Sequence, residues 1–228
     1  MKKIIVLTGA GMSAESGIKT FRDADGLWEG HDVMEVASPQ GFARNPELVL
    51  DFYNQRRQQL LKVTPNSAHI ALADLEKLFN ITIITQNVDD LHERAGSSNI
   101  VHLHGELLKV RSTFNPNLIY ERTKDITLED RCEKGSQLRP HIVWFGEQVP
   151  LLEKAIEITS TADILLIIGT SMQVYPAASL VNYIKRNTAI YFIDPKPSIQ
   201  ASSFNNLTII PEKATLGVQI LVENYLNG

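Results

Sequence analysis

The sequence predicts an α/β protein with an open parallel sheet, helices on both faces of that sheet and a smaller inserted lobe. Short apolar runs such as residues 4–7 and 164–168 are typical of strands that are buried on both faces. Segments with helical spacing of apolar residues lie between these runs, which end in glycine, amide or carboxylate residues. This alternation indicates a Rossmann-like arrangement with ligand-binding residues at the carboxyl ends of the strands.

The composition limits the classes of protein that this chain could be. Its 228 residues are enough to bury a sizeable core in one large or two small domains. A formal net charge of −4 gives no general attraction to nucleic acid or to an anionic membrane, so we expect neither as a partner. The apolar runs are too short to span a bilayer, and residues 1–3 lead directly into a strand and not into a signal peptide. We expect a cytoplasmic protein that acts as a monomer.

The first element is a strand over residues 4–7 that leads into a glycine turn at Gly9 and Gly11. The glycines permit a sharp turn and a close approach to a ligand, and Ser13 and Ser16 are good helix N-cap residues. A strand, a glycine turn and a helix N-terminus together suit a pyrophosphate. The same turn also occurs in α/β proteins without a ligand, so the glycines alone leave both interpretations open.

The rest of the chain alternates between the two kinds of element. The spacing of apolar residues, together with residues that typically begin or end helices, predicts helices over residues 45–61, 67–78, 151–161 and 175–186. The same criteria predict strands over residues 81–84, 100–103, 163–168 and 190–193. Residues 109–140 show no sustained period, as expected of a small appended lobe. We place the large lobe at residues 1–28, 66–107 and 142–228, and the small lobe at residues 29–65 and 108–141 of a single catalytic domain.

Five motifs occur along the chain, at residues 7–22, 85–92, 102–107, 143–147 and 169–176. In this order and at these separations they resemble the sirtuins, the family of NAD-dependent protein-lysine deacylases. The resemblance covers residue 4 to about residue 215 and is greatest to the bacterial class III members, which remove succinyl, malonyl and acetyl groups. It implies an enzyme that consumes NAD, acts on acyl-lysine proteins or peptides, and releases nicotinamide, O-acyl-ADP-ribose and free lysine.

The resemblance assigns roles to residues at the strand ends. His104 matches the general base that takes a proton from a ribose hydroxyl of NAD, a task that suits a side chain titrating near neutrality. Asn87 is the second catalytic candidate, and with Gln86 and Asp89 it matches the residues that orient the nicotinamide half of NAD. From the residues alone, His104 could equally be a structural hydrogen-bonding group and 86–89 a capped turn. The other NAD-binding candidates are Gly9, Ala10, Gly11, Ser13, Ala14, Gly17, Phe21, Arg22, Trp28, Gly169, Thr170, Ser171, Asp194 and Ala214.

A further set of residues matches the substrate side of the family's site. Tyr53 and Arg56 are three apart on a predicted helix, so both could grip one carboxylate, although a solvated helix face would show the same pattern. A Tyr-x-x-Arg pair here resembles the sirtuin class that removes succinyl and malonyl groups, and the small Ala37 agrees with it. The segment that would pair with an extended substrate peptide contains Val143, Phe145, Gly146 and Glu147.

The only cysteine, Cys132, excludes an internal disulfide and a four-cysteine zinc site. Sirtuins typically carry two cysteine pairs in the small lobe, whereas this chain has residues 111–112 and 131–133 where ligands would be expected. We therefore expect no zinc. In its place we expect a small replacement core made of Phe114, Ile119, Tyr120 and Leu128.

Four functions are compatible with these motifs. Besides deacylases, zinc-less sirtuin-like proteins include mono-ADP-ribosyltransferases and NAD hydrolases, and a catalytically silent NAD-binding module is a further possibility. Tyr53, Arg56 and residues 145–147 favour the deacylase, because an NAD hydrolase has no need of an acyl-lysine tunnel. His104 and Asn87 argue against the silent module.

Overall fold

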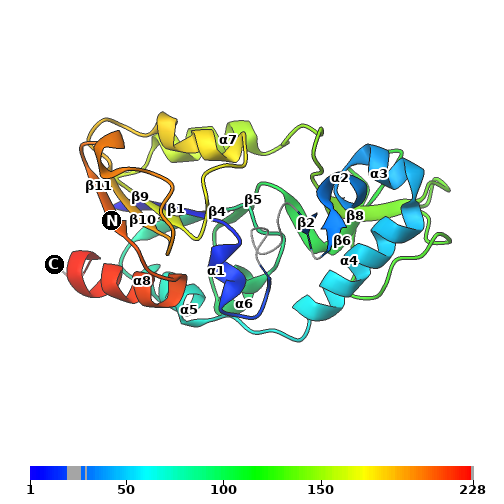
Figure 1. Cartoon of the computed structure of the whole chain (residues 1–228), viewed down its shortest axis with the longest axis horizontal. Helices are drawn as coiled ribbons and strands as arrows, with labels where there is room; N and C mark the ends of the chain where they lie inside the picture. Colours follow the sequence, from blue (N-terminus) through cyan, green and yellow to red (C-terminus); the bar gives the residue numbers. More distant parts are fainter. Residues whose placement is uncertain (20–26, 29, 227–228) are drawn as a thin grey trace.

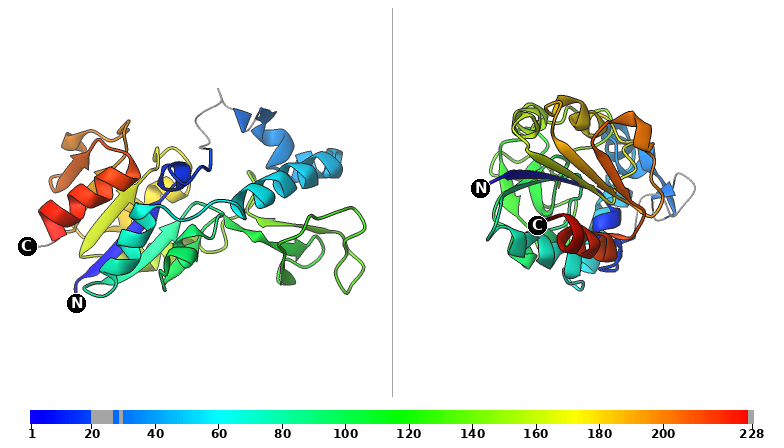
Figure 2. Two further views of the ribbon diagram at one scale, coloured as in Figure 1. Left: turned by 90° about the horizontal axis from the view of Figure 1, so that it is seen from below. Right: turned by 90° about the vertical axis from the view of Figure 1, so that its left-hand side faces the viewer.

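The computed structural model describes residues 1–19, 27–28 and 30–226. The molecule is elongated, with a large lobe built on a parallel sheet at one end and a smaller lobe at the other (Figure 1). The N-terminal strand and the C-terminal helix both lie in the large lobe, and their free ends point away from the small lobe (Figure 2). Among the described residues, no helix is both long and apolar enough to cross a bilayer.

The large lobe contains a six-stranded sheet in the order β11-β10-β9-β1-β4-β5. Every neighbouring pair in this sheet is parallel. Its strands are β1 (Lys3–Thr8), β4 (Asn80–Thr85), β5 (Ile100–His102), β9 (Ile164–Ile168), β10 (Ala189–Ile193) and β11 (Leu207–Ile210). Thr8 is level with Thr85 and with Ile168, so the segments that follow these strands begin at one edge of the sheet.

Helices cover both faces of this sheet, which confirms the predicted fold class. On one face α5 (Ser67–Leu75) and α8 (Ala214–Leu221) lie over a core that includes Ile4 and Val6. The short helix α6 (Leu91–Ala95) lies against α5, and its Leu91 is buried in a separate cluster with Tyr53 and Trp144. On the other face α7 (Leu152–Ser160) and the 3₁₀ helix η1 (Ala177–Tyr183) pack on Ile5 and Leu7. Successive β1 residues thus enter opposite cores, because side chains alternate along a strand. The short 3₁₀ segment η2 (Ala201–Ser203) and the π-helical end η3 (Val222–Leu226) complete this lobe.

The small lobe combines helices with antiparallel strands. Its three-stranded sheet has the order β7-β6-β8, made of β7 (Ile119–Glu121), β6 (Gly105–Ser112) and β8 (Leu138–Ile142). A small hairpin of β2 (Leu27–Trp28) and β3 (His31–Asp32) precedes α2 (Val33–Val36), α3 (Pro39–Arg44) and α4 (Pro46–Leu60). The predicted cap of α4 is confirmed, since the Asn45 side chain accepts a hydrogen bond from Leu48 N at 3.2 Å.

One local prediction was wrong and another was confirmed only in part. Ser13 and Ser16 do not cap a helix: α1 (Gly11–Ala14) is a short helix with Ala10 at its N-cap, and Ser13 lies inside it with its hydroxyl directed at Asp89. The segment predicted as a helix over residues 175–186 forms the 3₁₀ helix η1. Ser179 donates from both its amide and its hydroxyl to the Pro176 carbonyl, a three-residue pattern that competes with the α-helical one.

The replacement core of the small lobe also differs from the prediction. Ile119 is 43% exposed because it faces outward from the edge strand β7, and Phe114, in the segment between β6 and β7, is 75% exposed. Tyr120 and Leu128 do pack against the core, as partly buried neighbours. The buried residues are instead Leu50, Val110, Ile126, Cys132 and Leu138. Leu50 comes from α4, so this core depends on a helix distant in sequence.

Candidate active site

A cavity of about 760 Å³ lies at the carboxyl edge of the parallel sheet and reaches into the small lobe. This size is typical of pockets that hold small molecules and cofactors. Strand-end residues of the large lobe on its wall include Gly9, Ala10, Gly11, Ser13, Ala14, Gln86, Asn87, Asp89, His104, Gly169, Thr170, Ser171 and Asp194. Residues of the substrate set on its wall are Ala37, Tyr53, Arg56, Val143, Phe145, Gly146 and Glu147. The structure therefore brings together both groups of predicted site residues.

The glycine turn packs directly against the loop that follows β9. Gly9 N donates to Ile168 O at 3.0 Å, and Gly11 N donates to Gly169 O at 2.8 Å. A Cβ atom at Gly9 would lie 2.7 Å from Thr170 Cβ, and one at Gly11 would lie 2.7 Å from Gly169 Cα. No side chain fits between these loops. One wall of the cavity is consequently a main-chain surface, which a ligand can approach closely.

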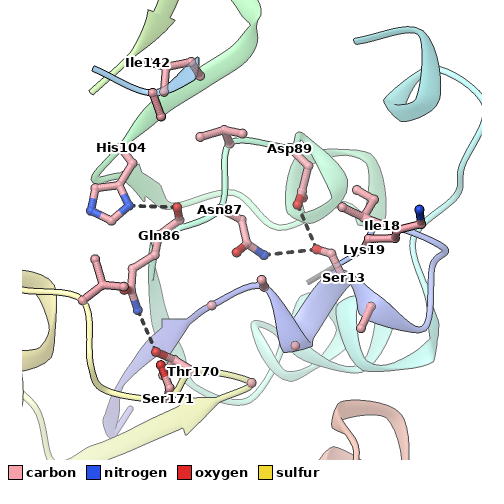
Figure 3. A pocket seen from close by; sticks show the side chains of 18 of the residues that line it. Ser13, Ile18, Lys19, Gln86, Asn87, Asp89, His104, Ile142, Thr170 and Ser171 are labelled. Atoms are coloured by element: carbon pink, nitrogen blue, oxygen red, sulfur yellow. Dashed lines mark hydrogen bonds between the residues drawn. The ribbon is translucent and has the colours of Figure 1, made fainter. Parts of the chain in front are cut away.

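A chain of buried hydrogen bonds fixes Asn87 (Figure 3). Asn87 Nδ2 donates to Ser13 Oγ at 3.1 Å, and Ser13 Oγ donates to Asp89 Oδ2 at 2.9 Å. Asp89 Oδ1 accepts from Leu91 N at 3.2 Å. Burial raises the pKa of Asp89 to about 6, although the hydrogen bond from Ser13 opposes this rise. The Asn87 amide oxygen is thereby turned away from Ser13 and available to a ligand.

His104 is oriented by a main-chain acceptor. Its Nδ1 lies 3.1 Å from Gln86 O, and because a carbonyl oxygen only accepts, Nδ1 carries the proton (Figure 3). Nε2 is then the basic nitrogen. Burial lowers the pKa of His104 below its usual 6.5, against the opposing effect of the Gln86 carbonyl. The imidazole is therefore neutral near pH 7 and able to take a proton, which suits a general base.

His102 is placed as a supporting residue, as its position two residues before His104 suggests. Its Nε2 lies 2.6 Å from Glu93 Oε1, and its Nδ1 lies 3.4 Å from Asn87 O. Burial alone would lower the pKa of His102, but the carboxylate of Glu93 outweighs burial and raises it. His102 does not line the cavity and instead braces the strand end that carries Asn87.

The opposite end of the cavity is formed by α4 and by the segment after β8. Tyr53 is fully buried, and its hydroxyl accepts a hydrogen bond from Trp144 Nε1 at 3.0 Å. Arg56 Nη1 donates to Phe52 O at 2.8 Å, and its Cζ lies 3.8 Å from the centroid of the Phe52 ring. Burial raises the pKa of Tyr53 well above its usual 10, so the phenol stays neutral. Tyr53 and Arg56 thus present a phenol and a guanidinium to one pocket, as their spacing predicts.

Some predicted site residues are not on this wall. Phe21 and Arg22 lie outside the described residues, as does the side chain of Trp28. Gly17 does not line the cavity, since it closes the turn after α1 with a φ of 99°. Ala214 does not line it either, because it is buried in the core at the start of α8.

The cavity wall also includes side chains that the sequence did not single out. They include Lys19, Gln59, Ile142, Trp144, Lys196 and Lys213. Lys19 lies inside the motif at residues 7–22 and Trp144 inside the motif at residues 143–147, so their positions were usable signals, whereas no local pattern distinguishes Lys196 and Lys213 from other lysines. Within the described residues, no group of three or more His, Cys, Asp and Glu side chains is arranged to hold a metal ion.

Comparison with known proteins places the chain in a family. The sequence model described as "Sir2 family" matches residues 9–176. The chain belongs to the Sir2 family. This Sir2-family chain is 62% identical over 226 residues to a protein of Helicobacter pylori (strain ATCC 700392 / 26695) named "NAD-dependent protein deacylase", which covers 99% of this chain and 98% of the relative. A Bacteroides thetaiotaomicron protein of the same name is 54% identical, over 97% of each chain.

Solved Sir2 structures have the same fold as this Sir2-family chain. A Sir2 homologue in complex with NAD superimposes with a TM-score of 0.89 at 43% identity, covering 99% of this chain and 90% of that chain. A mutant Sir2 homologue in complex with ADP-ribose also gives a TM-score of 0.89 at 43% identity, covering 97% and 91%. The sirtuin resemblance and the α/β fold are both confirmed.

Proposed function

We propose that this protein removes acyl groups from protein lysine side chains in a reaction that consumes NAD, with a preference for acyl groups that end in a carboxylate, such as succinyl and malonyl. The relatives named NAD-dependent protein deacylase and the Sir2 homologues solved with NAD and ADP-ribose support the reaction. One observation carries the preference: Tyr53 and Arg56 lie on the wall of the same cavity as His104.

The groups on the cavity wall fit NAD. The main-chain surface at Gly9 and Gly11 can approach a pyrophosphate closely, and hydroxyl groups of Thr170 and Ser171 stand beside it. Asp194 is buried at the end of β10, where its Oδ1 accepts from Lys196 N at 2.8 Å and its carboxylate can accept from ribose hydroxyls. NAD supplies the glycosidic bond to nicotinamide, whose cleavage makes the ribose carbon available to the acyl oxygen.

The protein's own part in the reaction is orientation and proton transfer. His104 Nε2 takes a proton from a ribose hydroxyl while Nδ1 holds its hydrogen bond to Gln86 O. Asn87, fixed by Ser13, orients the reacting half of NAD. The apolar side chains of Leu107 and Ile142 line the same cavity and exclude water from it.

Residues 143–147, the substrate segment, are attached to both lobes. Val143 N donates to His104 O at 2.9 Å, and Phe145 N donates to Ala37 O at 2.9 Å. An extended peptide that pairs with the main chain of residues 143–147 would bring its acyl-lysine into the cavity between His104 and α4. Main-chain pairing tolerates many sequences, so we propose that several proteins are substrates.

Product analysis by mass spectrometry tests this function. Purified protein is incubated with NAD and with succinyl-lysine and acetyl-lysine peptides of identical sequence, beside His104→Ala and the exposed control variant Lys77→Ala. We expect O-succinyl-ADP-ribose from the wild type and from Lys77→Ala, and a loss of roughly 10²-fold or more in His104→Ala, the usual size of a general-base contribution. Free ADP-ribose or ADP-ribosylated protein as the sole product would instead identify an NAD hydrolase or an ADP-ribosyltransferase.

A further inference from the structure

Two buried arginines lie behind the end of the cavity that is formed by α4 and by the segment after β8. Arg111 on β6 and Arg139 on β8 are directly opposite each other in the antiparallel register, and neither lines the cavity. Like charges in such a cross-strand pair repel and destabilise a sheet. The pair therefore requires a shared anion, and the structure supplies one in Glu147.

Glu147 collects hydrogen bonds from both arginines. Arg139 binds it with its two terminal guanidinium nitrogens, Nη1 to Oε1 at 2.6 Å and Nη2 to Oε2 at 3.1 Å. Arg111 Nη2 donates to Oε2 at 3.0 Å, and Trp144 N donates to the same oxygen at 2.8 Å. Burial would raise the pKa of Glu147, but the hydrogen bond from Arg139 and the other donors outweigh it and keep the carboxylate ionised.

The same arginines also hold Ile142, the residue just before the substrate segment. Arg111 Nη2 donates to Ile142 O at 3.2 Å, and Arg139 Nη2 donates to that oxygen at 3.0 Å. Ile142 itself faces the cavity above His104 (Figure 3). Residues 142–147 are thus tied to the small-lobe sheet at one end by a main-chain carbonyl and at the other by a carboxylate.

Arg139 makes one contact that Arg111 does not. Its Cζ lies 3.3 Å from the centroid of the Trp144 ring, a stacked cation–π arrangement in a buried setting. Trp144 Nε1 in turn donates to Tyr53 Oη at 3.0 Å. A continuous series of contacts therefore runs from Glu147 through Arg139 and Trp144 to Tyr53, and it joins the substrate segment to α4.

We propose that Arg139 is a positioning residue for acyl selectivity: through Trp144 it holds the Tyr53 hydroxyl, and through Glu147 it holds the substrate segment, at the separation that a carboxylated acyl-lysine requires. This inference rests on the proposed deacylase function. Arg111 serves as the internal comparison, because it shares the contacts to Glu147 and Ile142 but does not touch Trp144.

Steady-state kinetics of Arg139→Met and Arg111→Met separate the two halves of this network. For Arg139→Met we expect KM for the succinyl-lysine peptide to rise roughly tenfold, since small misplacements of a positioning group are costly. KM for the acetyl-lysine peptide should rise about twofold, and KM for NAD should not change. Arg111→Met is expected to raise both peptide KM values by the same factor. Arg139→Lys keeps the charge but lacks the planar fork, so it should fall between Arg139→Met and the wild type, and it replaces Arg139→Met if that variant does not fold.

Tryptophan fluorescence tests the contact without relying on activity. The chain has two tryptophans, so in a Trp28→Phe background the emission reports Trp144 alone. We expect Arg139→Met and Arg139→Lys to shift this emission and Arg111→Met to leave it unchanged.

Two outcomes overturn the proposal, and a third concerns the function instead. If Arg139→Met raises both peptide KM values in parallel, as Arg111→Met does, or if the Trp144 emission is the same in every variant, Arg139 has no positioning role through Trp144. If the wild type releases neither acyl group, the proposed function fails, and the emission measurement alone then decides whether Arg139 positions Trp144.

Discussion

The two lobes bury different kinds of side chain. In the large lobe the sheet is covered by apolar residues on both faces, and the buried charged or titratable groups among its described residues are Asp89, Asp194, His69 and His92. In the small lobe three arginines are buried, Arg57 on α4, Arg111 on β6 and Arg139 on β8. Across the part of the chain that the structure describes, no buried arginine or lysine lies in the large lobe.

This difference shows two ways of fixing a binding site. Apolar packing is non-directional, so the large lobe provides a stable base whose strand ends bring the NAD-binding groups together. Hydrogen bonds from guanidinium groups are directional, so the small lobe fixes the angles of α4 and of the substrate segment. A buried arginine is costly to desolvate and leaves unpaired acceptors when it is removed. We therefore expect the small lobe to respond most to polar substitutions and the large lobe to respond most to apolar truncations.

The largest expected effect concerns Arg57, the largest fully buried side chain of the small lobe. Its Nε donates to Leu107 O at 3.2 Å and its Nη1 to Asn54 Oδ1 at 2.7 Å. Arg57→Met keeps much of the volume but removes the donors, so we expect it to lower the unfolding free energy by about 2–3 kcal/mol. In the large lobe Leu72→Met, at a fully buried position of α5, should cost less than about 1.5 kcal/mol because it conserves volume and removes no hydrogen bond.

Urea denaturation of both variants gives the two free energies, and truncation to alanine is the matched control. Leu72→Ala and Arg57→Ala should each cost about 3 kcal/mol or more, since both leave a cavity. An equal fall in unfolding free energy for Arg57→Met and Leu72→Met would show that the two lobes are stabilised in the same way, and it would contradict the proposed difference between them.

An intermediate effect is expected when the pH falls. His69 and His92 lie side by side in the large lobe with ring centroids 4.8 Å apart, and burial lowers the pKa of His69 to about 4 and that of His92 to about 3. Unfolded histidines titrate near 6.5, so between pH 6.5 and about 4 these two histidines bind more protons in the unfolded state, and their contribution to stability falls as the pH falls. Asp89, whose pKa is raised to about 6, acts in the opposite direction and offsets part of this fall. Glu147 has a lowered pKa, so its contribution is present above about 4.5 and is lost only below that value.

As the pH falls, the large lobe should therefore lose stability at a higher pH than the small lobe. Urea denaturation at neutral pH and at about pH 4.5 should show a loss of about 2 kcal/mol that is reduced in a His69→Gln, His92→Gln double variant. Glu147→Gln is the comparison and should leave this window unchanged. An identical loss in the double variant and in the wild type would mean that the histidine pair does not control acid sensitivity.

The smallest expected effect concerns the helix caps. Asn45 accepts one hydrogen bond at the start of α4, so Asn45→Ala should cost about 1 kcal/mol. Asn66 accepts from Ala68 N and His69 N at the start of α5 and also donates to Met12 O at 2.9 Å, so Asn66→Ala should cost more. Thermal unfolding of the two variants checks this order. A larger fall in melting temperature for Asn45→Ala would contradict it.

The sequence predicted what depends on local pattern. The parallel sheet follows from apolar runs, and because parallel strands end at one edge, the residues after them, such as Asn87 and Thr170, were correctly brought together. The small-lobe core was predicted wrongly since its members meet only through the fold, as Leu50 of α4 does with Val110 of β6.

The burial of Arg111 and Arg139 was equally invisible in the sequence. Arginine is usually a surface residue, and their shared partner Glu147 lies 36 residues from Arg111. Lys196 and Lys213 on the cavity wall come from a loop and a helix end whose placement no local pattern fixes. The prediction therefore held for strand ends and failed where distant polar partners decide burial.

The most direct test of the central claim is the ratio of kcat/KM for succinyl-lysine over acetyl-lysine peptides in the wild type, Tyr53→Phe and Arg56→Met. Arg44→Met, which removes an exposed arginine outside the cavity, is the control. We expect the wild type and Arg44→Met to prefer the succinyl peptide. Arg56→Met should lower kcat/KM for that peptide by roughly 10²-fold and change kcat/KM for the acetyl peptide by less than about threefold. The reason is that a buried charge-assisted hydrogen bond is lost for the succinyl substrate alone. If Arg56→Met lowers both values equally, Tyr53 and Arg56 shape the lobe but do not bind the acyl carboxylate.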